Sequence, residues 1–503
     1  MPGHVFVVQG RMEALLRDAF VVTTDAEFTI EPHWLPVLGE RDASALRPDG
    51  WGEGERVHGV ARGRTDCWFL DVSTGSLEAI MRGLAEVLDG IARAGVVAAA
   101  GRALPLVGVP VPGIGGGGLG EHAGAVIARL LETLHEAVRR HDLDVAVVAT
   151  TPARFAAVQR ERRLSGSFPV PAGLLDHAKA IAGLARSGEL ALFLGAGVSV
   201  SAGLPSWAGL IEEIRRAAID KGAHIPEDEF DALGVLDQTE LLHALLQDEL
   251  ETLVAERFAD VTPALSHALL AGLQCAEAVT TNYDSGYETA VRARDQGAPI
   301  AVMPWEKPVP GRPWLLKLHG DAARPGSVVL TRGQFIGYDS RWRPVGSVFQ
   351  ALMMTRRLLV VGASLTDDNV LRLAHEVRAL RRRHAIDEPL GYALSLGPPP
   401  LRARLWGNDL EWIGLEGGSE AEQARQLEIL LDVVATHASH SSPYLLQPEF
   451  ADLLNPDLEV GLADQARELG RRIASATSRG ELRQEEAWRG LLAVLEDRGV
   501  PPA

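Results

Sequence analysis

Residues 189–207 read ELALFLGAGVSVSAGLPSW, and this stretch decides the fold of the central part of the chain. An apolar run that is typical of a buried strand leads into Gly195-Ala196-Gly197 and then into a helix-compatible stretch. A strand, a glycine turn and a helix start place backbone N–H groups and the positive end of a helix dipole at one point, which suits a pyrophosphate. Small residues leave space for the phosphate. On its own, such a turn serves ordinary strand-to-helix packing equally well.

Working outward, further apolar runs predict a parallel α/β sheet over residues 174–435. They read AVTTN at 278–282, LLKLHG at 315–320 and LLVVGASL at 358–365, and long helical patterns separate them. The helix-rich stretch 205–273 is too long for a simple crossover between two strands. We therefore expect a small helical subdomain to be inserted there.

Strand and helix patterns also alternate in residues 1–165. VFVVQG at 5–10 and DVAVVATT at 144–151 are strand-like, and 77–94 and 123–140 have helical spacing, which predicts a second α/β domain. The Ser-, Pro- and Gly-rich segment 165–173 marks a boundary. From 436 to 503 the pattern is that of short amphipathic helices, so we expect a helical C-terminal tail.

Composition excludes several classes of protein. The 503 residues include 49 Lys and Arg against 67 Asp and Glu, a net charge of −18, which disfavours direct nucleic acid or anionic membrane partners. Two cysteines are too few for a disulfide scaffold or a four-thiolate zinc site, so a cytoplasmic location is expected. The first residues do not resemble a secretory signal, and the uncharged run 103–120 contains too many Pro and Gly residues to be a spanning helix.

Four segments in a fixed order resemble the sirtuin (Sir2) fold over residues 185–425. They are GAGVS with AGLP at 195–205, TTNYD at 280–284, LHGD at 318–321 and GASL at 362–365. The resemblance implies a Rossmann-like parallel sheet with a helical insertion. In such a sheet the segments lie at the carboxyl ends of neighbouring strands, where ligands bind.

The resemblance also implies a set of NAD-binding residues and two catalytic residues. Asn282 would orient water or ribose at the reacting carbon, Asp284 would hold the nicotinamide carboxamide, and His319 matches the catalytic histidine of the family. The remaining NAD contacts would come from Gly195, Ala196, Gly197, Ser199, Gly203, Pro205, Trp207, Gly362 and Ser364. Each polar residue also has a structural alternative: Ser199 as a helix cap, Asn282 as a turn residue and His319 as a hydrogen-bonded core residue.

The residue types suit the chemistry independently of the family. Cleavage of the ribose–nicotinamide bond leaves an electron-poor, oxocarbenium-like sugar. An imidazole with a pKa near neutrality can take a proton from a ribose hydroxyl or from water, and an uncharged amide can position that water. His319 and Asn282 would supply these two functions.

The chain departs from the deacetylating sirtuins. No cysteine follows Cys275, so the four-cysteine zinc module is missing and no zinc is expected. The Pro-Asp-Phe-Arg of that family is replaced by PSWA at 205–208, and the Gln before its Asn by Thr281. With VLTRGQF at 329–335, the motifs are similar to the zinc-free Sir2-like domains of bacterial anti-phage systems, which hydrolyse NAD to ADP-ribose and nicotinamide.

The first 165 residues resemble a macro domain, an ADP-ribose-binding α/β module. The resemblance rests on VFVVQG at 5–10, DAFVV at 18–22 and LVGVP at 106–110, which leads into a glycine block at 113–120. Arg11 stands where the family has an Asp that contacts adenine. The glycine block either cradles a diphosphate or forms a flexible surface loop. If it binds an ADP-ribose-like ligand, the domain could act as a sensor.

These observations lead to one hypothesis and two alternatives. We expect a cytoplasmic NAD glycohydrolase that depletes NAD in abortive infection, as a homo-oligomer and with a possible defence-system partner protein. The first alternative is an NAD-dependent protein deacylase. The second is a non-enzymatic assembly protein gated by nucleotide, against which the joint presence of Asn282 and His319 argues.

Overall fold

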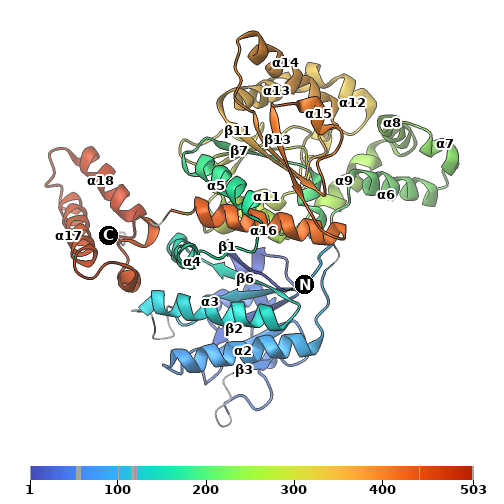
Figure 1. The fold of residues 1–503 in the computed structure, drawn as a ribbon. Helices are drawn as coiled ribbons and strands as arrows, with labels where there is room; N and C mark the ends of the chain where they lie inside the picture. Colours follow the sequence, from blue (N-terminus) through green and yellow to red (C-terminus); the bar gives the residue numbers. More distant parts are fainter. Residues whose placement is uncertain are drawn as a thin grey trace. The chain divides into compact units, whose positions relative to one another are not determined.

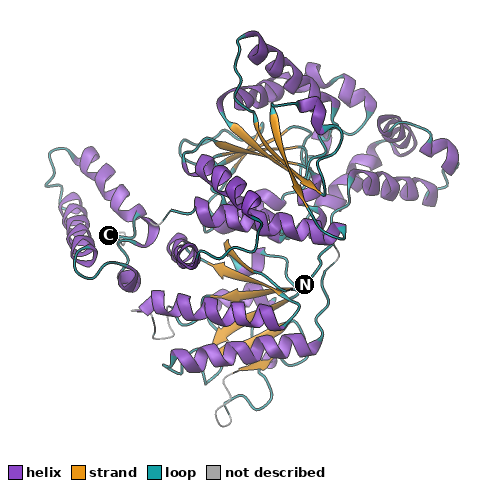
Figure 2. Ribbon diagram, in the orientation of Figure 1, coloured by secondary structure: helices purple, strands orange, loops and turns teal. Residues whose placement is uncertain are grey.

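A computed structural model describes residues 2–52, 58–99, 101–114, 119, 122–440 and 442–500. The chain divides into two compact units (Figure 1). Unit 1 comprises Met1–Ala99, Leu104–Pro169 and Ala435–Ala503, and unit 2 comprises Ala100–Ala103 and Val170–Val434. In each unit a sheet is flanked by helices (Figure 2), which confirms the expected α/β class.

Unit 2 contains a seven-stranded sheet within its described residues, in the order β13-β12-β11-β7-β8-β10-β9, and every strand pair is parallel. The strands are β7 (Leu190–Leu194), β8 (Glu277–Thr280), β9 (Ala301–Met303), β10 (Trp314–Lys317), β11 (Arg357–Val361), β12 (Gly391–Leu396) and β13 (Leu410–Leu415). All five residues of β7 are buried, as expected for a strand covered on both faces. The chain leaves β7 for β8 on one side and reaches β11 on the other, so β7 lies at the topological switch point, where open sheets bind ligands.

Helices cover this sheet and also form the predicted insertion. Those around the sheet are α5 (Ala172–Arg186), α10 (Leu265–Gly272), α11 (Gly286–Arg294), α12 (Arg332–Ile336), α13 (Tyr338–Thr355), α14 (Asp368–Arg383), α15 (Ala403–Trp406) and α16 (Glu420–Ala438). The insertion contains α6 (Trp207–Asp220), α7 (Glu227–Asp231), α8 (Val235–Leu246) and α9 (Asp248–Phe258). Ile211, Leu242 and Val254 of these helices share an apolar cluster with residues of the loops after β8 and β10, such as Tyr283 and Leu330. The four helices confirm the expected helical insertion.

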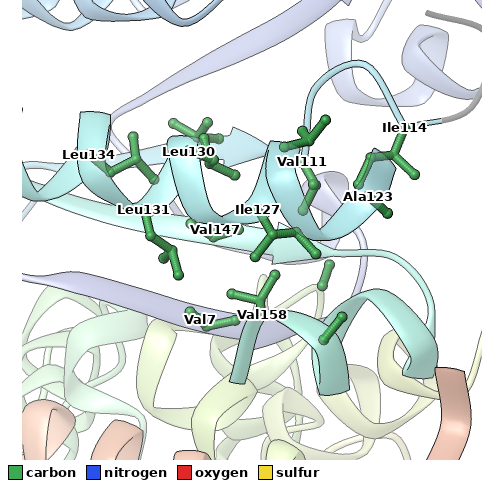
Figure 3. Packing of buried hydrophobic residues seen from close by; sticks show 14 of the residues in the cluster. Val7, Val111, Ile114, Ala123, Ile127, Leu130, Leu131, Leu134, Val147 and Val158 are labelled. Atoms are coloured by element: carbon green, nitrogen blue, oxygen red, sulfur yellow. The ribbon is translucent and has the colours of Figure 1, made fainter. Parts of the chain in front are cut away.

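Unit 1 is built on a six-stranded sheet in the order β1-β6-β5-β2-β4-β3, in which the described pairs are parallel except β3–β4. The strands are β1 (Val5–Gln9), β2 (Ala19–Thr24), β3 (His58–Val60), β4 (Cys67–Asp71), β5 (Leu106–Pro110) and β6 (Asp144–Ala149). The helices are α1 (Leu35–Leu38), α2 (Leu77–Ala94), α3 (Ala123–Arg140) and α4 (Pro152–Ser165). Ile127, Leu130 and Leu134 recur at helical spacing along the buried face of α3 (Figure 3).

The C-terminal segment is helical, as the sequence predicts, and it packs within unit 1. It contains α17 (Glu459–Ser478) and α18 (Glu485–Asp497), which follow the 3-10 segments Ser442–Tyr444 and Pro448–Leu453. Phe450 is fully buried in the same apolar cluster as α3. Both carboxylate oxygens of Asp452 accept hydrogen bonds from the first turn of α3, at 3.0 Å from Gly124 N and from Ala125 N. The tail thus caps a helix from a distant part of the sequence.

Two sequence expectations concern particular segments of the chain. Most of the glycine block proposed to cradle a diphosphate, namely 115–118 and 120, lies outside the described residues. The macro-domain resemblance of residues 1–165 therefore stays a prediction. Among the described residues, no helix combines the length and the apolar composition needed to cross a bilayer.

Candidate active site

A pocket of about 620 Å³ lies at the carboxyl edge of the unit 2 sheet. Its wall comes from the loops after β7, β8, β10 and β11, from the start of α6 and from parts of α8, α9 and α12. Loops after neighbouring parallel strands meet at one edge of a sheet, so segments far apart in sequence share this wall. The volume is within the range of small-molecule sites.

The pocket brings together most of the residues selected from the sequence. Those that line it are Gly195, Ala196, Gly197, Ser199, Pro205, Trp207, Asn282, Asp284, His319, Gly362 and Ser364. Gly203 is not part of the lining. It ends the 3-10 segment Val200–Ala202 with a φ of 78°, a left-handed conformation that favours glycine.

The glycines after β7 have a packing reason that the sequence does not reveal. A Cβ on Gly195 would lie 2.5 Å from Ala363 Cα, and one on Gly197 would lie 2.8 Å from Gly362 Cα. The N–H of Gly195 donates to Val361 O and that of Gly197 to Gly362 O, both at 2.9 Å. These two N–H groups are therefore used in joining the β7 and β11 loops, which corrects the expectation that they would converge on a phosphate.

The helix start is also displaced from the glycine turn. Two 3-10 segments, Ala196–Val198 and Val200–Ala202, follow β7, and α6 begins only at Trp207. Ser206 caps α6, its side chain accepting from Gly209 N at 3.2 Å. The first turn of α6 therefore meets the pocket through residues 205–208, rather than through the glycines.

Asn282 is anchored through one end of its side chain. Its Nδ2 donates to Gly195 O at 3.0 Å and to Ser199 Oγ at 3.3 Å. Because a carbonyl oxygen can only accept, this pairing identifies the amide nitrogen, and the other end must be the Oδ1 acceptor. Oδ1 is buried and has no hydrogen-bond partner among the described residues. An orphaned acceptor in a pocket wall is suited to a hydroxyl or water donor.

Ser199 and Asp284 form a buried network with His267, which sequence reasoning missed. The Nδ1 of His267 accepts from Ala264 N at 3.1 Å, so in the neutral ring the proton is on Nε2, 3.2 Å from Ser199 Oγ. Ser199 Oγ in turn donates to Asp284 Oδ2 at 2.9 Å. Burial lowers the pKa of His267, against the opposing effect of Asp284, so its neutral form is favoured. Ser199 is 2% exposed, and its contacts are those of a group that positions Asn282 and Asp284.

A buried lysine supports the loop that carries Asn282 and Asp284. Lys317 Nζ lies 2.8 Å from Glu288 Oε1 and 3.3 Å from Asp321 Oδ2, and it donates to Asp284 O at 2.7 Å. Its side chain is fully buried. Such a cluster ties β10, α11 and the loop after β8 together beneath the pocket. Sequence reasoning did not select Lys317, although it precedes the LHGD motif directly.

His319 is 3% exposed and lies among aromatic side chains. Its ring centroid is 5.2 Å from that of Phe335 and 6.2 Å from that of Tyr338, both in edge-on contacts. Its Nε2 lies 3.4 Å from Asp367 Oδ2, a charge contact that does not meet hydrogen-bond geometry. Burial lowers the pKa of His319, while Asp367 acts to raise it. At neutral pH the ring is therefore a neutral base.

An aromatic cluster forms another part of the wall. Tyr283 is 4% exposed, and its hydroxyl donates to Val329 O at 2.8 Å. Its ring packs against Phe258 at 5.7 Å and Trp207 at 6.5 Å between centroids. Flat apolar surfaces beside a few fixed polar groups are typical of nucleotide-sized binding sites.

Leu365, in the loop after β11, has an unusual backbone conformation in the pocket wall. It has a φ of 51°, which is unusual for a bulky residue, and it lines the pocket. Residues held in such conformations concentrate at functional sites. Across the described part of the chain, no group of three or more His, Cys, Asp or Glu residues could hold a metal ion.

Comparison with known proteins agrees with this geometry. Residues 276–411 match the family model of the SIR2-like domain. The chain is 26% identical over 220 residues to "Defense-associated sirtuin 2" of Bacillus subtilis, a match that covers 41% of this chain and 21% of that protein. It is 28% identical over 208 residues to "NAD(+) hydrolase ThsA" of Bacillus cereus, covering 39% of this chain and 42% of that protein. It is 27% identical over 201 residues to "NAD(+) hydrolase ThsA" of Acinetobacter baumannii, a match that covers 38% of this chain and 39% of that protein. The matches thus span from about a fifth to about two fifths of these relatives.

Proposed function

We propose that this chain, which carries a SIR2-like domain, is an NAD+ glycohydrolase that cleaves the nicotinamide–ribose bond to give ADP-ribose and nicotinamide. The observation that carries the proposal is the meeting of Asn282 and His319 in one pocket at the switch point of the sheet. Relatives named as NAD+ hydrolases support the same activity.

The polar groups of the pocket suit each step of this reaction. Oδ1 of Asn282 is a free acceptor that can orient a water molecule or a ribose hydroxyl at the anomeric carbon. His319, neutral and buried, can take the proton from that oxygen as it adds. The carboxylate of Asp284 has both oxygens engaged by Ser199 and by Gly286 N, so it is held rigidly in the wall. A fixed negative charge there would stabilise the positive charge that develops on the sugar.

The deacylase alternative has less support. It requires a groove for an acyl-lysine peptide, and PSWA at 205–208 replaces the motif of that family at the start of α6. A purely binding protein would have no need of a neutral histidine and an orphaned amide oxygen together in its pocket. We therefore rank hydrolysis above both alternatives.

Product analysis separates the three functions. The purified 503-residue chain, over a range of concentrations that includes any assembled state, is incubated with NAD+, and nicotinamide and ADP-ribose are quantified. The proposal predicts equal amounts of both products with no peptide present. Product release only with an acyl-lysine peptide, accompanied by O-acyl-ADP-ribose, would identify a deacylase. An assembly that binds NAD+ and leaves it intact would refute hydrolysis.

We further propose a biological role in anti-phage defence, in which activity depletes NAD+ after infection. The name "Defense-associated sirtuin 2" of one relative supports that role. A cytoplasmic location, homo-oligomer formation, a defence-system partner and an ADP-ribose-like ligand at unit 1 belong to the same proposal. Loss of NAD+ from infected cells that express the chain, compared with an inactive variant, would test the role.

A further inference from the structure

Asp367 is a pocket carboxylate that the sequence did not single out. It lies after β11 and is the N-cap of α14, where its Oδ1 accepts from Val370 N at 2.9 Å. That hydrogen bond restrains the carboxylate, because a large rotation of the side chain would break the cap. The second oxygen, Oδ2, is held 3.4 Å from His319 Nε2. One side chain thus joins a helix terminus to the imidazole of the pocket.

His319 is surrounded by uncharged rings, so its contact with the carboxylate of Asp367 matters for its charge state. The ring edges of Phe335 and Tyr338 enclose it and carry no charge at neutral pH. The other titratable groups of the pocket are Tyr283 and Asp284 on the loop after β8, and Asp368 at the first position of α14. Asp367 is the carboxylate in contact with the ring. An imidazolium at this buried position depends on such a counter-charge.

We propose that Asp367 is the positioning residue for His319, holding the imidazole proton on Nε2 and leaving Nδ1 as the base that faces the substrate. This inference rests on the proposed NAD+ hydrolysis. A carboxylate can only accept hydrogen bonds, so the ring nitrogen that faces it is the protonated one in either charge state. In the present structure the 3.4 Å contact is both long and outside hydrogen-bond geometry, and catalytic contacts of this kind often tighten and align when substrate binds.

The proton inventory of the step is balanced. Water adds its oxygen to the anomeric carbon, and nicotinamide leaves with the electron pair of the C–N bond. The O–H bond of the water breaks, and its proton goes to Nδ1 of His319. The ring is then an imidazolium whose Nε2–H faces Asp367. Release of that proton to solvent restores the neutral base, and no oxidant or further reactant is needed.

Two substitutions at Asp367 separate the positioning function from capping. Asp367→Asn and Asp367→Ser both keep a side-chain oxygen that can cap α14, and both remove the negative charge. Asp339→Asn is the matched control, because Asp339 is 56% exposed, pairs with Arg372 on the surface and does not line the pocket. Thermal unfolding of all three variants verifies that the fold is kept, and Asp367→Asn alone suffices if the shorter serine is unstable.

The kinetic test is the pH profile of NAD+ hydrolysis. Removing Asp367 should lower kcat about 10²-fold with little change in KM, since the interaction acts through His319 rather than on bound NAD+. The acid limb of kcat should move to lower pH, because Asp367 acts to raise the pKa of His319. Asp339→Asn should leave kcat and the position of its acid limb unchanged. Wild-type kcat and an unshifted acid limb in Asp367→Asn would overturn the inference.

A second readout requires no activity. In protein labelled with 15N-histidine, the two ring nitrogens report the tautomer, and the His319 signals are those lost in His319→Gln. We expect the Nε2–H tautomer in wild type and a mixture of tautomers in Asp367→Asn. Finding the Nδ1–H tautomer in wild type would overturn the inference whatever the kinetics. If wild type releases no nicotinamide in any state, the proposed function fails, and the tautomer measurement still decides the role of Asp367.

Discussion

Gly195 and Gly197 lack a Cβ atom, and this absence lets the loop after β7 pack directly against the loop after β11. A Cβ on Gly195 would enter the space of Gly362 O and Ala363 Cα, each at 2.5 Å. We expect Gly195→Ala to lower the free energy of unfolding by about 1–3 kcal/mol, because these are backbone atoms that cannot turn away. Denaturant unfolding measures this change. Gly183→Ala in α5, where a Cβ meets nothing within 4 Å, should stabilise by about 0.5–1 kcal/mol. Equal effects of the two substitutions would contradict the close-approach argument.

His267 links stability to pH at the residue scale. Burial lowers its pKa in the folded protein below the ordinary value near 6.5. As pH falls below about 6.5, the unfolded chain binds a proton that folded His267 resists, so the free energy of unfolding should decrease. In His267→Gln, whose amide nitrogen can still donate to Ser199, this decrease should be smaller. Chemical unfolding between pH 5 and 8 measures how the free energy of unfolding changes with pH in wild type and in His267→Gln. The same pH dependence in both would show that His267 is not held neutral.

Residue patterns predicted much of the site, but not the contacts that hold it. The resemblance of TTNYD and LHGD to motifs of the sirtuin fold implies Asn282, Asp284 and His319, and all three line one pocket because strand ends meet at one edge of a parallel sheet. His267 could not be found in this way, since it enters from α10, and Asp367, although it lies in the loop after β11, is outside the quoted motifs. The run TDDNV at 366–370 signals an N-cap, yet a sequence does not show which cap faces a pocket.

At the scale of elements, Lys317 fastens the loop after β8 to β10 and α11. Lys317→Met would leave Glu288 buried without its cation and would leave Asp321 with Arg324 alone, and it should lower the free energy of unfolding by about 3–5 kcal/mol. The double variant Lys317→Met/Glu288→Gln should recover part of this loss, because one buried negative charge is removed with the positive one. Denaturant unfolding of the two variants tests the prediction. A double variant less stable than Lys317→Met would contradict it.

The C-terminal tail stabilises a helix of unit 1 through Asp452. The N-cap residue of α3, His122, makes no side-chain cap hydrogen bond, and Asp452 accepts from the N–H groups of its first turn instead. Asp452→Ala should therefore lower the free energy of unfolding by about 1–2 kcal/mol. Asp457→Ala, at an exposed position of the same tail, should change it by less than about 0.5 kcal/mol. Equal stability of the two variants would show that Asp452 is not a cap.

At the scale of the molecule, the sequence pattern predicted two α/β domains and a helical tail, and the structure has two sheets and C-terminal helices. The pattern did not show that residues 435–503 form one compact unit with residues near the N-terminus. Phe450 and Asp452 of the tail contact α3, more than 300 residues earlier in the chain. Local periodicity contains no information about such distant partners. Strand order likewise follows from packing of whole elements rather than from any one segment.

The central claim is that Asn282 and His319 act on one bound dinucleotide. Nicotinamide release from NAD+ and NAD+ affinity are measured side by side for wild type, Asn282→Ala and His319→Ala, in the state in which wild type is active. We expect both variants to keep NAD+ affinity within about tenfold and to lose at least about 10²-fold in turnover, since one residue orients the nucleophile and the other takes its proton. Wild-type turnover in either variant would contradict the claim.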